Sequence, residues 1–297
     1  MFKKSSKDRR SVYMLEKYTK PLTINGITLD YTQETFIMGI LNVTPDSFSD
    51  GGKYNNVEAA VTQAKKMVAE GAKIIDVGGE STRPGYERIS DEDEIARIVP
   101  VIQALAKEVK VIISVDTYKA RVARAAIEAG AHIINDIWGA KAEPEIAQVA
   151  ADLHVPIILM HNRENMDYGV DFWPTAKADL EESITIAQQA GVPDYHIILD
   201  PGIGFAKNTA QNISMMQHLS DLVAMGYPVL LATSRKSMIG NVLKLPVEER
   251  LEGTSATVVY GIEKGCHMIR VHDVKEMARA TYMADVLVGK RLFKEEA

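Results

Sequence analysis

Short apolar runs recur along this 297-residue chain, and polar or charged side chains end each of them. These polar positions are Asn42, Glu80 to Arg83, Asp116, Asn135 and Asp136, His161 and Asn162, Asp200, Ser234 to Lys236, and Arg270 with His272. A single such residue is usually structural, because burying a polar group costs free energy unless the group is paired. Polar residues after all eight runs instead predict a shared site for a polar ligand.

Basic side chains gather after the last two runs. They are Arg235, Lys236, Arg270 and His272, and many α/β barrels bind a phosphate group in this region. The alternative for each arginine is an ion pair with a nearby carboxylate such as Asp273. The sequence therefore predicts an anion-binding region, with both interpretations open for the two arginines.

Carboxylate and amide side chains end three of the other runs, at Asp116, Asn135 and Asp200. An ionised aspartate accepts two parallel N–H bonds, whereas asparagine both donates and accepts. This combination suits a flat heterocycle that carries N–H donors and a carbonyl group. Together with the basic region, it predicts a phosphorylated heterocyclic substrate.

The apolar runs are too short and too rich in β-branched residues for helices, and they are typical of strands buried on both faces. The predicted strands are 36–43, 73–79, 111–117, 132–137, 156–161, 196–201, 228–234 and 268–273. The predicted helices are 57–70, 92–108, 119–129, 143–152, 175–190, 209–225, 247–264 and 274–289. A glycine follows five of these helices, as expected for a left-handed C-cap, namely Gly71, Gly130, Gly191, Gly226 and Gly265.

Strands that alternate with helices predict an α/β fold, and eight such units favour a (β/α)8 TIM barrel over a doubly wound sheet. Neither of the phosphate-binding glycine motifs G-x-G-x-x-G and G-x-x-x-x-G-K-[ST] occurs, which also argues against a doubly wound sheet. Residues 22–31 predict an N-terminal β-hairpin around Asn25-Gly26. In such a barrel the site lies at the carboxyl ends of the strands, where the polar residues stand.

Length and composition limit the number of domains, the partners and the location that the chain can have. The length allows two domains, but α/β barrels of this size often form one. We predict one domain over residues 13–297, after a basic, disordered tail at 1–12. The net charge of −6 argues against a nucleic-acid partner, and the single Cys266 excludes an internal disulfide and a Cys-based zinc cluster. No apolar run approaches the ~18 residues of a membrane span, and no secretory signal follows the basic start, so a cytoplasmic location is predicted.

Two connecting segments, 44–56 and 81–90, are long and rich in Gly, Pro and Ser, and they carry Phe48 and Tyr86. Loops of this composition are candidates for lids that close over a substrate. The alternative is that they are ordinary long loops of a barrel.

A family resemblance is carried by seven segments, each at a predicted strand end. They are LNVTPDSFSDGG (41–52), GGESTRPG (78–85), SVDTYK (114–119), INDIWG (134–139), LDPGIGF (199–205), TSRKS (233–237) and RVHDV (270–274). In these segments the chain closely resembles dihydropteroate synthases, and the resemblance extends from about residue 36 to the end of the chain. The first two segments together are highly specific for that family.

The resemblance implies a single barrel, commonly a homodimer, that uses Mg²⁺. It implies condensation of 7,8-dihydropterin-6-ylmethyl diphosphate with p-aminobenzoate, which gives 7,8-dihydropteroate and diphosphate in folate synthesis. The implied pterin contacts are Asp116, Asn135, Ile137, Met160, Asp200, Phe205 and Lys236. The implied diphosphate contacts are Asn42, beside or through the metal, Arg270 and His272, which with Lys236 form the implied catalytic set. The implied p-aminobenzoate site consists of Phe48, Asp50, Thr82, Arg83, Pro84 and Ser237.

The diphosphate leaves an allylic-like carbon that is attached to an electron-rich ring, which favours a dissociative, SN1-like displacement because both developing charges can be stabilised. Two rival functions stay open. A methyltetrahydrofolate–corrinoid methyltransferase would keep the pterin-binding Asp and Asn but has no use for the TSRKS and RVH segments. A non-catalytic pterin-binding module would be expected to lack a leaving-group ligand, and Asn42, Lys236, Arg270 and His272 are all present.

Overall fold

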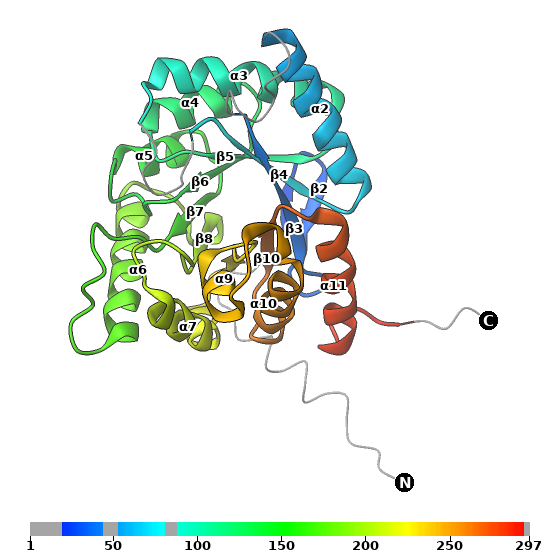
Figure 1. Ribbon diagram of the computed structural model, residues 1–297. Coiled ribbons are helices and arrows are strands. Elements are labelled where there is room, and N and C mark those ends of the chain that lie inside the picture. Colours follow the sequence, from blue (N-terminus) through cyan, green and yellow to red (C-terminus); the bar gives the residue numbers. More distant parts are fainter. Residues whose placement is uncertain (1–19, 44–52, 81–87, 294–297) are drawn as a thin grey trace.

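Eight parallel strands form one nearly closed barrel in the computed structural model, which describes residues 20–43, 53–80 and 88–293 (Figure 1). The strands are β3 (Phe36–Asn42), β4 (Ile74–Gly78), β5 (Ile112–Asp116), β6 (Ile133–Asp136), β7 (Ile157–Met160), β8 (Ile197–Asp200), β9 (Leu230–Leu231) and β10 (Met268–Val271). They hydrogen-bond in the order β8-β7-β6-β5-β4-β3-β10-β9. A parallel bridge between Leu199 and Val229 brings the two ends of the sheet together. The predicted (β/α)8 TIM barrel is confirmed.

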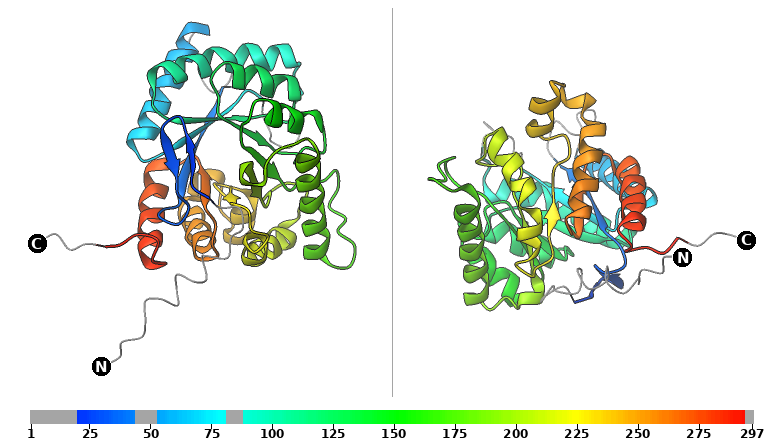
Figure 2. Two further views of the ribbon diagram at one scale, coloured as in Figure 1. Left: turned by 180° about the vertical axis from the view of Figure 1, so that it is seen from behind. Right: turned by 90° about the horizontal axis from the view of Figure 1, so that it is seen from below.

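Helices surround the barrel on its outside (Figures 1 and 2). They are α2 (Lys53–Ala69), α3 (Asp91–Glu108), α4 (Ala120–Glu128), α5 (Glu145–Asp152), α6 (Phe172–Gln189), α7 (Thr209–Gln217), α8 (Leu219–Val223), α9 (Ser237–Leu243), α10 (Leu251–Glu263) and α11 (Val274–Leu287), with short 3₁₀ helices η2 (Asp194–His196) and η3 (Val247–Glu249). The five glycines predicted as C-caps all have positive φ, between 94° and 116°. These turns allow each helix to end and the chain to enter the next strand.

The predicted N-terminal hairpin is present as β1 (Leu22–Ile24) and β2 (Ile27–Leu29), which pair antiparallel. Asn25 and Gly26 form the turn, with φ of 50° and 71°. The hairpin lies across the end of the barrel that faces the viewer in the left view of Figure 2. Leu29 packs there against an inner apolar layer to which every barrel strand contributes: Met38, Ile74, Ile112, Ile133, Ile158, Ile198, Leu230 and Met268. The hairpin thus closes the amino end of the barrel and leaves the carboxyl end as the open face.

The prediction was wrong in detail around the seventh strand. Helix 209–225 is interrupted at His218, so that it becomes α7 and α8. Strand 228–234 is reduced to Leu230–Leu231, and an unpredicted helix, α9, follows it. Seven residues are too few to show a helical period in the sequence, and α9 is held by tertiary packing. A Cβ on its Gly240 would lie only 2.2 Å from Arg250 Nη2.

The division into a tail at 1–12 and one domain over 13–297 stays a prediction, since residues 1–19 lie outside the described part of the chain. Within the described ranges, no helix is both long enough and apolar enough to cross a membrane.

Candidate active site

Side chains alternate between the barrel interior and its outside along each strand, because successive residues of a strand point to opposite faces. The inner apolar layer therefore fixes which residues of the next layer also point inward. Two positions further toward the carboxyl end, this second layer contains Asp76, Ser114, Asn135, Asp200 and Arg270. Asp116 points to the same side as Ser114, because it stands two residues further along β5. The interior thus changes from apolar to polar as it approaches the open face.

Arg270 on β10 joins two carboxylates that lie on neighbouring strands. Its Nε donates to Asp76 Oδ2 at 2.6 Å, and its Nη2 donates to Asp116 Oδ2 at 2.7 Å. Asn135 on β6 donates from Nδ2 to the same Asp76 Oδ2 at 3.0 Å. The arginine side chain is only 15% exposed, and both carboxylates are buried. The structure thus brings Asp116, Asn135 and Arg270 together through Asp76.

Two oxygens of this network have no hydrogen-bond partner within the described residues. They are Asp76 Oδ1 and Asp116 Oδ1, and both are buried. Buried polar atoms in folded proteins are nearly always hydrogen-bonded, so unpaired acceptors in a concave interior need an explanation. Two free carboxylate oxygens suit a ligand that offers N–H donors.

Asp200 at the end of β8 is held by the loop that follows it. Its Oδ1 accepts the N–H of Gly202 at 2.7 Å. Gly202 has a φ of 65°, and a Cβ there would lie 1.9 Å from the carbonyl oxygen of His161, so only glycine fits. Lys207 fastens the same loop by donating from Nζ to the carbonyl oxygens of Gly202 and Phe205, each at 3.0 Å.

Lys236 directly precedes α9 and packs over the same loop. Its Nζ lies 4.3 Å from the centre of the Phe205 ring, a cation–π contact. A Cβ on Gly204 would lie 3.1 Å from Lys236 Cδ, so the glycine allows the lysine stem to approach. The predicted contacts Lys236, Phe205 and Asp200 are thereby collected at one side of the barrel mouth.

An apolar cluster forms part of the same mouth. Tyr118, Ile137 and Met160 are buried together, and Trp138 and Phe205 pack against them. The cluster contains three of the predicted pterin contacts, Ile137, Met160 and Phe205. Apolar surfaces beside a few directed polar groups are typical of small-molecule sites.

Burial shifts the pKa values of the polar residues in opposite directions. It raises the pKa of Asp200 to about 6, although the N–H of Gly202 and the charge of Lys236 partly offset this effect. Burial likewise raises the pKa of Asp116, against the attraction of Arg270. The pKa of Lys236 is lowered to about 8 by burial and by the positive charge of Arg270.

His272 follows β10 and is exposed, and partial desolvation together with the charge of the neighbouring Arg270 lowers its pKa below the usual value, so the imidazole is neutral at pH 7. Its Nδ1 lies 2.9 Å from Ser234 Oγ, and that oxygen also accepts the backbone N–H of His272 at 3.2 Å. If the serine hydroxyl donates to Nδ1, the imidazole proton lies on Nε2, and His272 then offers a neutral N–H donor there.

Asn42 ends β3 as an exposed residue, whereas the six residues before it are buried. A Cβ on Gly78 would lie 3.7 Å from both Asn42 Oδ1 and Asp116 Oδ2. The amide of Asn42 therefore stands beside the Asp116 end of the network. Ser237 is exposed as the first residue of α9, directly after Lys236.

Several polar residues at strand ends have structural roles instead. Asp136 caps a turn by accepting the N–H groups of Trp138 and Ala140 at 2.7 and 2.6 Å. His161 Nε2 lies 3.0 Å from Asp179 on α6, outside the barrel. Arg235 forms a two-pronged ion pair with Asp273, at 2.9 and 2.5 Å. The alternative interpretation, an ion pair with a carboxylate, is therefore confirmed for Arg235, and it holds for Arg270 as well, whose partners are Asp76 and Asp116.

Five predicted contacts fall on segments outside the described residues. They are Phe48, Asp50, Thr82, Arg83 and Pro84.

Asp76 was missed by the sequence analysis, although it lies at the centre of the network. It stands inside the apolar run 73–79 and is the only carboxylate there. That isolated charge was the available signal, because a buried carboxylate within a strand needs a partner.

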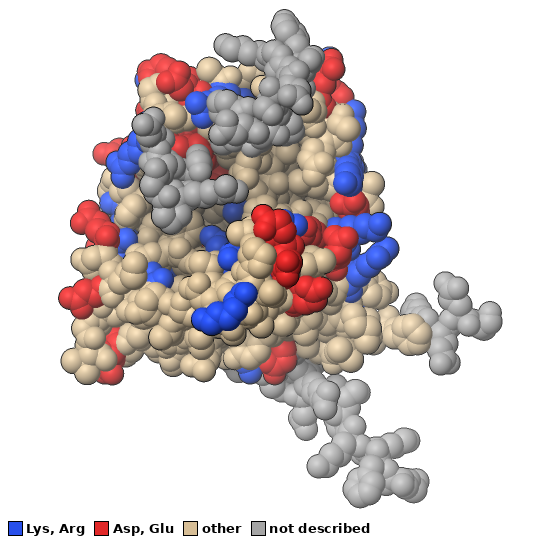
Figure 3. Space-filling model, in the orientation of Figure 1, with Lys and Arg blue, Asp and Glu red and all other residues tan. Residues whose placement is uncertain are grey.

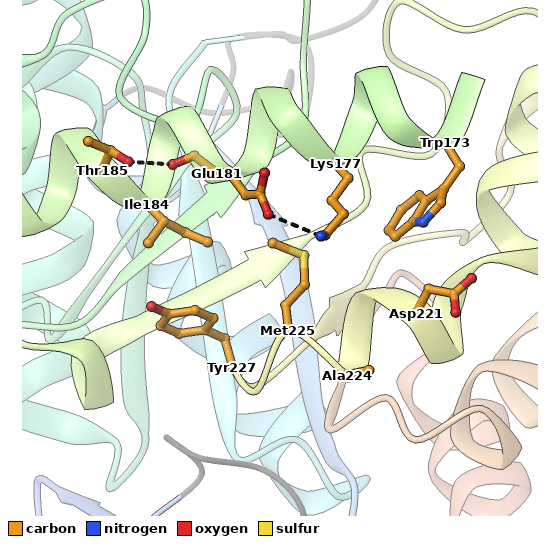
Figure 4. A pocket seen from close by; sticks show the side chains of 9 residues that line it. All are labelled: Trp173, Lys177, Glu181, Ile184, Thr185, Asp221, Ala224, Met225 and Tyr227. Carbon is orange, nitrogen blue, oxygen red and sulfur yellow. Dashed lines mark hydrogen bonds and ion pairs between the residues drawn. The ribbon is translucent and has the colours of Figure 1, made fainter. Parts of the chain in front are cut away.

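The open face of the barrel is hollowed at its centre, and basic side chains are visible in the hollow (Figure 3). A separate depression of about 540 Å³ lies on the outer surface, between α6 and the segment from α8 to β9 (Figure 4). Its walls include Trp173, Ile184, Met225 and Tyr227, beside an ion pair of Lys177 with Glu181. None of the predicted site residues that the structure describes lines this outer depression.

Comparison with known proteins places the chain in a family. The sequence matches the family described as pterin binding enzyme over residues 38–272. It is 56% identical to the dihydropteroate synthase of Bacillus subtilis over 273 residues, covering 92% of this chain and 94% of that protein. It is 57% identical to the dihydropteroate synthase of Clostridium beijerinckii over 259 residues, covering 87% and 96%.

Solved structures agree with the sequence relatives. A dihydropteroate synthase of Clostridium difficile, solved in the presence of pteroic acid, matches with a TM-score of 0.85 at 47% identity, covering 87% of this chain and 98% of that one. The Xanthomonas albilineans dihydropteroate synthase with 4-aminobenzoic acid matches with a TM-score of 0.84 at 39% identity, covering 91% and 98%. The Yersinia pestis enzyme with a sulfonamide drug matches with a TM-score of 0.84 at 42% identity, covering 91% and 100%. Because these matches extend over most of the chain, the protein belongs to the dihydropteroate synthase family of pterin binding enzymes.

Proposed function

We propose that this protein condenses 7,8-dihydropterin-6-ylmethyl diphosphate with p-aminobenzoate to give 7,8-dihydropteroate and diphosphate. The observation that carries the proposal is the buried network of Asp76, Asp116, Asn135 and Arg270, with its two unpaired carboxylate oxygens. A reduced pterin offers ring N–H groups that match such acceptors. The family relatives, one solved with pteroic acid, support this choice.

In this proposal the pterin ring lies between the polar network and the apolar cluster. Asp116, Asn135, Asp200 and Lys236 hold its polar edge. Ile137, Met160 and Phe205 contact its faces.

The charge distribution suits an SN1-like displacement. Asp116 and Asp200 stabilise the cation that develops on the pterin side as the leaving group departs, provided that both are ionised. Arg270 and the Nε2–H of His272 hold the diphosphate, where negative charge develops. Such preorganised groups act most strongly when they face the position of the developing charge. p-Aminobenzoate then attacks through its amine, with Ser237 near its carboxylate and with Phe48, Asp50, Thr82, Arg83 and Pro84 as its further proposed contacts.

In this proposal Mg²⁺ binds as a partner of the diphosphate. Within residues 20–43, 53–80 and 88–293, no three His, Cys, Asp or Glu side chains are placed to hold a metal ion. Mg²⁺ usually keeps several waters and binds substrate phosphates with few protein ligands. The exposed amide oxygen of Asn42 suits such a partial site. When bound, the ion would neutralise charge on the leaving group.

Mg²⁺ titrated into the ligand-free protein is therefore expected to bind weakly, and to bind more tightly when diphosphate is present. Isothermal titration calorimetry measures both states, with a titration of Mg²⁺ into diphosphate alone subtracted. Asn42→Ala should weaken diphosphate binding in the presence of Mg²⁺ and change it little in the absence of the ion. Tight Mg²⁺ binding to the ligand-free protein would contradict the partial site.

The value of kcat/KM for the pterin substrate is expected to be highest near pH 7 and to fall at both lower and higher pH. Asp200, with a pKa of about 6, and Asp116, whose pKa burial also raises, must both be ionised to accept N–H bonds, so activity falls as the pH decreases and these carboxylates become protonated. Lys236, with a pKa of about 8, must be protonated to donate, so activity falls as pH increases through that value. Lys236→Arg keeps its charge at high pH and should move the alkaline limb upward. An alkaline limb that is identical in Lys236→Arg would assign that limb to another group.

We also propose a homodimer that buries an apolar surface on α10 and α11. These two helices pack against each other, and they expose Val259, Tyr260, Tyr282, Met283 and Leu287. Large apolar side chains that are exposed together on one surface are typical of subunit interfaces.

The predicted cytoplasmic location stays a prediction.

The decisive experiment mixes the purified protein with the pterin diphosphate, p-aminobenzoate and Mg²⁺, and measures both diphosphate and dihydropteroate. Equal amounts of the two products are expected, and a sulfonamide should inhibit in competition with p-aminobenzoate. Omitting p-aminobenzoate is the control for simple hydrolysis of the substrate. Tight pterin binding without any product would instead support a non-catalytic module. Methyl transfer from methyltetrahydrofolate to a corrinoid would support the rival methyltransferase.

A further inference from the structure

The loop between β8 and α7, residues 201–208, is folded around a buried lysine of its own, Lys207. This lysine is only 6% exposed, and its Nζ donates to the carbonyl oxygens of Gly202 and Phe205, each at 3.0 Å, and to that of His161 at 3.5 Å. Within the described residues, no carboxylate forms a hydrogen bond with this ammonium group. Lysines are almost never fully buried without a paired carboxylate, so this arrangement needs an explanation.

Gly202 connects Lys207 to Asp200. The N–H of Gly202 donates to Asp200 Oδ1 at 2.7 Å, and its carbonyl oxygen accepts from Lys207 Nζ at 3.0 Å. Among the described residues, the Asp200 carboxylate has no other hydrogen-bond partner. The direction of this carboxylate therefore depends on where Lys207 holds Gly202.

The same ammonium group holds Phe205 through its carbonyl oxygen. The ring of Phe205 contacts Lys236 Nζ and packs against the apolar cluster of the mouth. Ala206, between Phe205 and Lys207, has a φ of 44°, a left-handed conformation that residues other than glycine rarely adopt. The loop is therefore held in its shape by tertiary contacts, and Lys207 supplies three of them.

Lys207 also acts on Asp200 through its charge. Burial lowers the pKa of Lys207 to about 7, against the attraction of Asp200, and this value lies above the pKa of about 6 of Asp200. Lys207 is therefore charged at the pH at which Asp200 titrates, and a nearby positive charge favours the ionised carboxylate. The other titratable or charged groups around these two residues are His161, Lys141, Asp179, Lys236 and Arg270.

We propose that Lys207 is a positioning residue for pterin binding. It holds Asp200 through the backbone of Gly202, and its charge favours the ionised carboxylate. It holds Phe205 through the carbonyl oxygen of that residue. The inference rests on the proposed function, in which Asp200 and Phe205 contact the pterin, whereas the hydrogen bonds of Lys207 itself go to backbone carbonyl oxygens.

Lys207→Met tests the proposal in the full-length protein, with the pterin diphosphate titrated calorimetrically between pH 5 and pH 8. At the pH of tightest binding, the dissociation constant is expected to rise on the order of 10-fold, since small displacements of positioned groups have effects of this size or larger. The acid limb of binding, where affinity falls as the pH decreases, is expected to move upward by on the order of one pH unit, because Asp200 loses a neighbouring positive charge. Lys65→Met is the surface control, because Lys65 pairs with Glu108 at 2.7 Å but is 52% exposed.

Asn212→Ala is the matched control within the same structure. Asn212 is buried on α7, accepts the N–H of Gly204 at 2.7 Å and donates to the carbonyl oxygen of Lys207 at 3.0 Å, so it supports the same loop without carrying a charge. Asn212→Ala is expected to weaken pterin binding and to leave the acid limb at its wild-type pH. A merely structural role of Lys207 predicts the same result for Lys207→Met.

Two further variants separate hydrogen bonding, charge and stability. Lys207→Gln can still donate to the loop carbonyls but carries no charge, so it is expected to recover part of the affinity and of the melting temperature while the acid limb stays at the higher pH. Asp200→Asn removes the carboxylate that responds to the charge. Adding Lys207→Met to Asp200→Asn is therefore expected to leave the acid limb of that variant unmoved, and an equal movement in both backgrounds would overturn the action of Lys207 on Asp200.

The outcomes distinguish this inference from the proposed function. Absence of product with the wild-type protein would overturn the proposed function. Product formation by the wild type, with unchanged pterin affinity and an unchanged acid limb in Lys207→Met, would overturn the positioning role alone. Weaker binding by Lys207→Met with the acid limb unmoved, as expected for Asn212→Ala, would also overturn it.

Discussion

Asp76→Asn is expected to lower both the stability and the activity of this protein more than any other isosteric change in the site. Asp76 Oδ2 accepts from Arg270 and from Asn135 at once, and the substitution leaves Arg270 with Asp116 as its only anionic partner in the described network. Removing one partner from a buried ion pair typically destabilises a protein by about 3–5 kcal/mol. If the substitution destabilises the transition state by the same free energy, kcat/KM falls by roughly 100-fold or more, because about 1.4 kcal/mol corresponds to a tenfold change in rate.

Urea denaturation gives the stability of Asp76→Asn, and steady-state kinetics with the pterin diphosphate gives its activity. Asp152→Asn is the matched control, because Asp152 pairs with Arg124 at 2.8 Å on the exposed surface. An exposed pair contributes about 1 kcal/mol or less, so the control should be close to wild type. If Asp76→Asn behaved like this control, the network would not orient Arg270.

Asp200→Asn is expected to weaken binding of the pterin diphosphate by on the order of 30-fold or more. The substitution keeps the shape of the side chain but replaces one acceptor by an N–H₂ group. If Oδ1 keeps its bond to the N–H of Gly202, the new donor faces the donors of the pterin. Disrupting one partner of a buried, charged hydrogen bond typically costs about 2–5 kcal/mol.

Calorimetric titration of the pterin diphosphate measures this effect without catalysis. Asp221→Asn provides the control, since Asp221 is an exposed residue of α8 that pairs with His218. A melting temperature close to wild type would show that Gly202 and its loop keep their conformation. Near-native affinity of Asp200→Asn would remove Asp200 from the pterin site.

The sequence by itself determined the architecture and the end of the barrel at which the polar groups gather. Eight apolar runs separated by helical patterns specify strands that are covered on both faces, and this requirement leaves few folds. The glycines after the helices and Asn25-Gly26 in the hairpin were predictable because their positive φ is a local property. The polar residues at the strand ends were predictable because all carboxyl ends of a parallel barrel meet at one face.

Only the tertiary structure decided which of these polar residues face one another. A strand that is apolar on both faces gives no sign of which alternate residues point inward. Asp136 was therefore grouped with Asn135, although it points outward and caps a turn, and Asp76 was missed, although it points inward. Residue type and spacing alone did not distinguish Arg235 from Arg270, yet one pairs with Asp273 and the other joins Asp76 to Asp116.

Short helices and ion pairs between residues far apart in sequence were likewise not predictable from the sequence alone. Helix α9 has too few residues for a visible period, and its Gly240 packs closely against the Arg250 side chain, which is distant from it in sequence. Lys119 stood in a recognisable segment, SVDTYK, but its partners Glu80 and Glu94 lie 39 and 25 residues away along the chain. Local sequence determines the strands, helices and turns, because these depend on neighbouring residues. Long-range pairing of charges depends on how the strands are staggered around the barrel, and only the assembled tertiary structure determines that stagger.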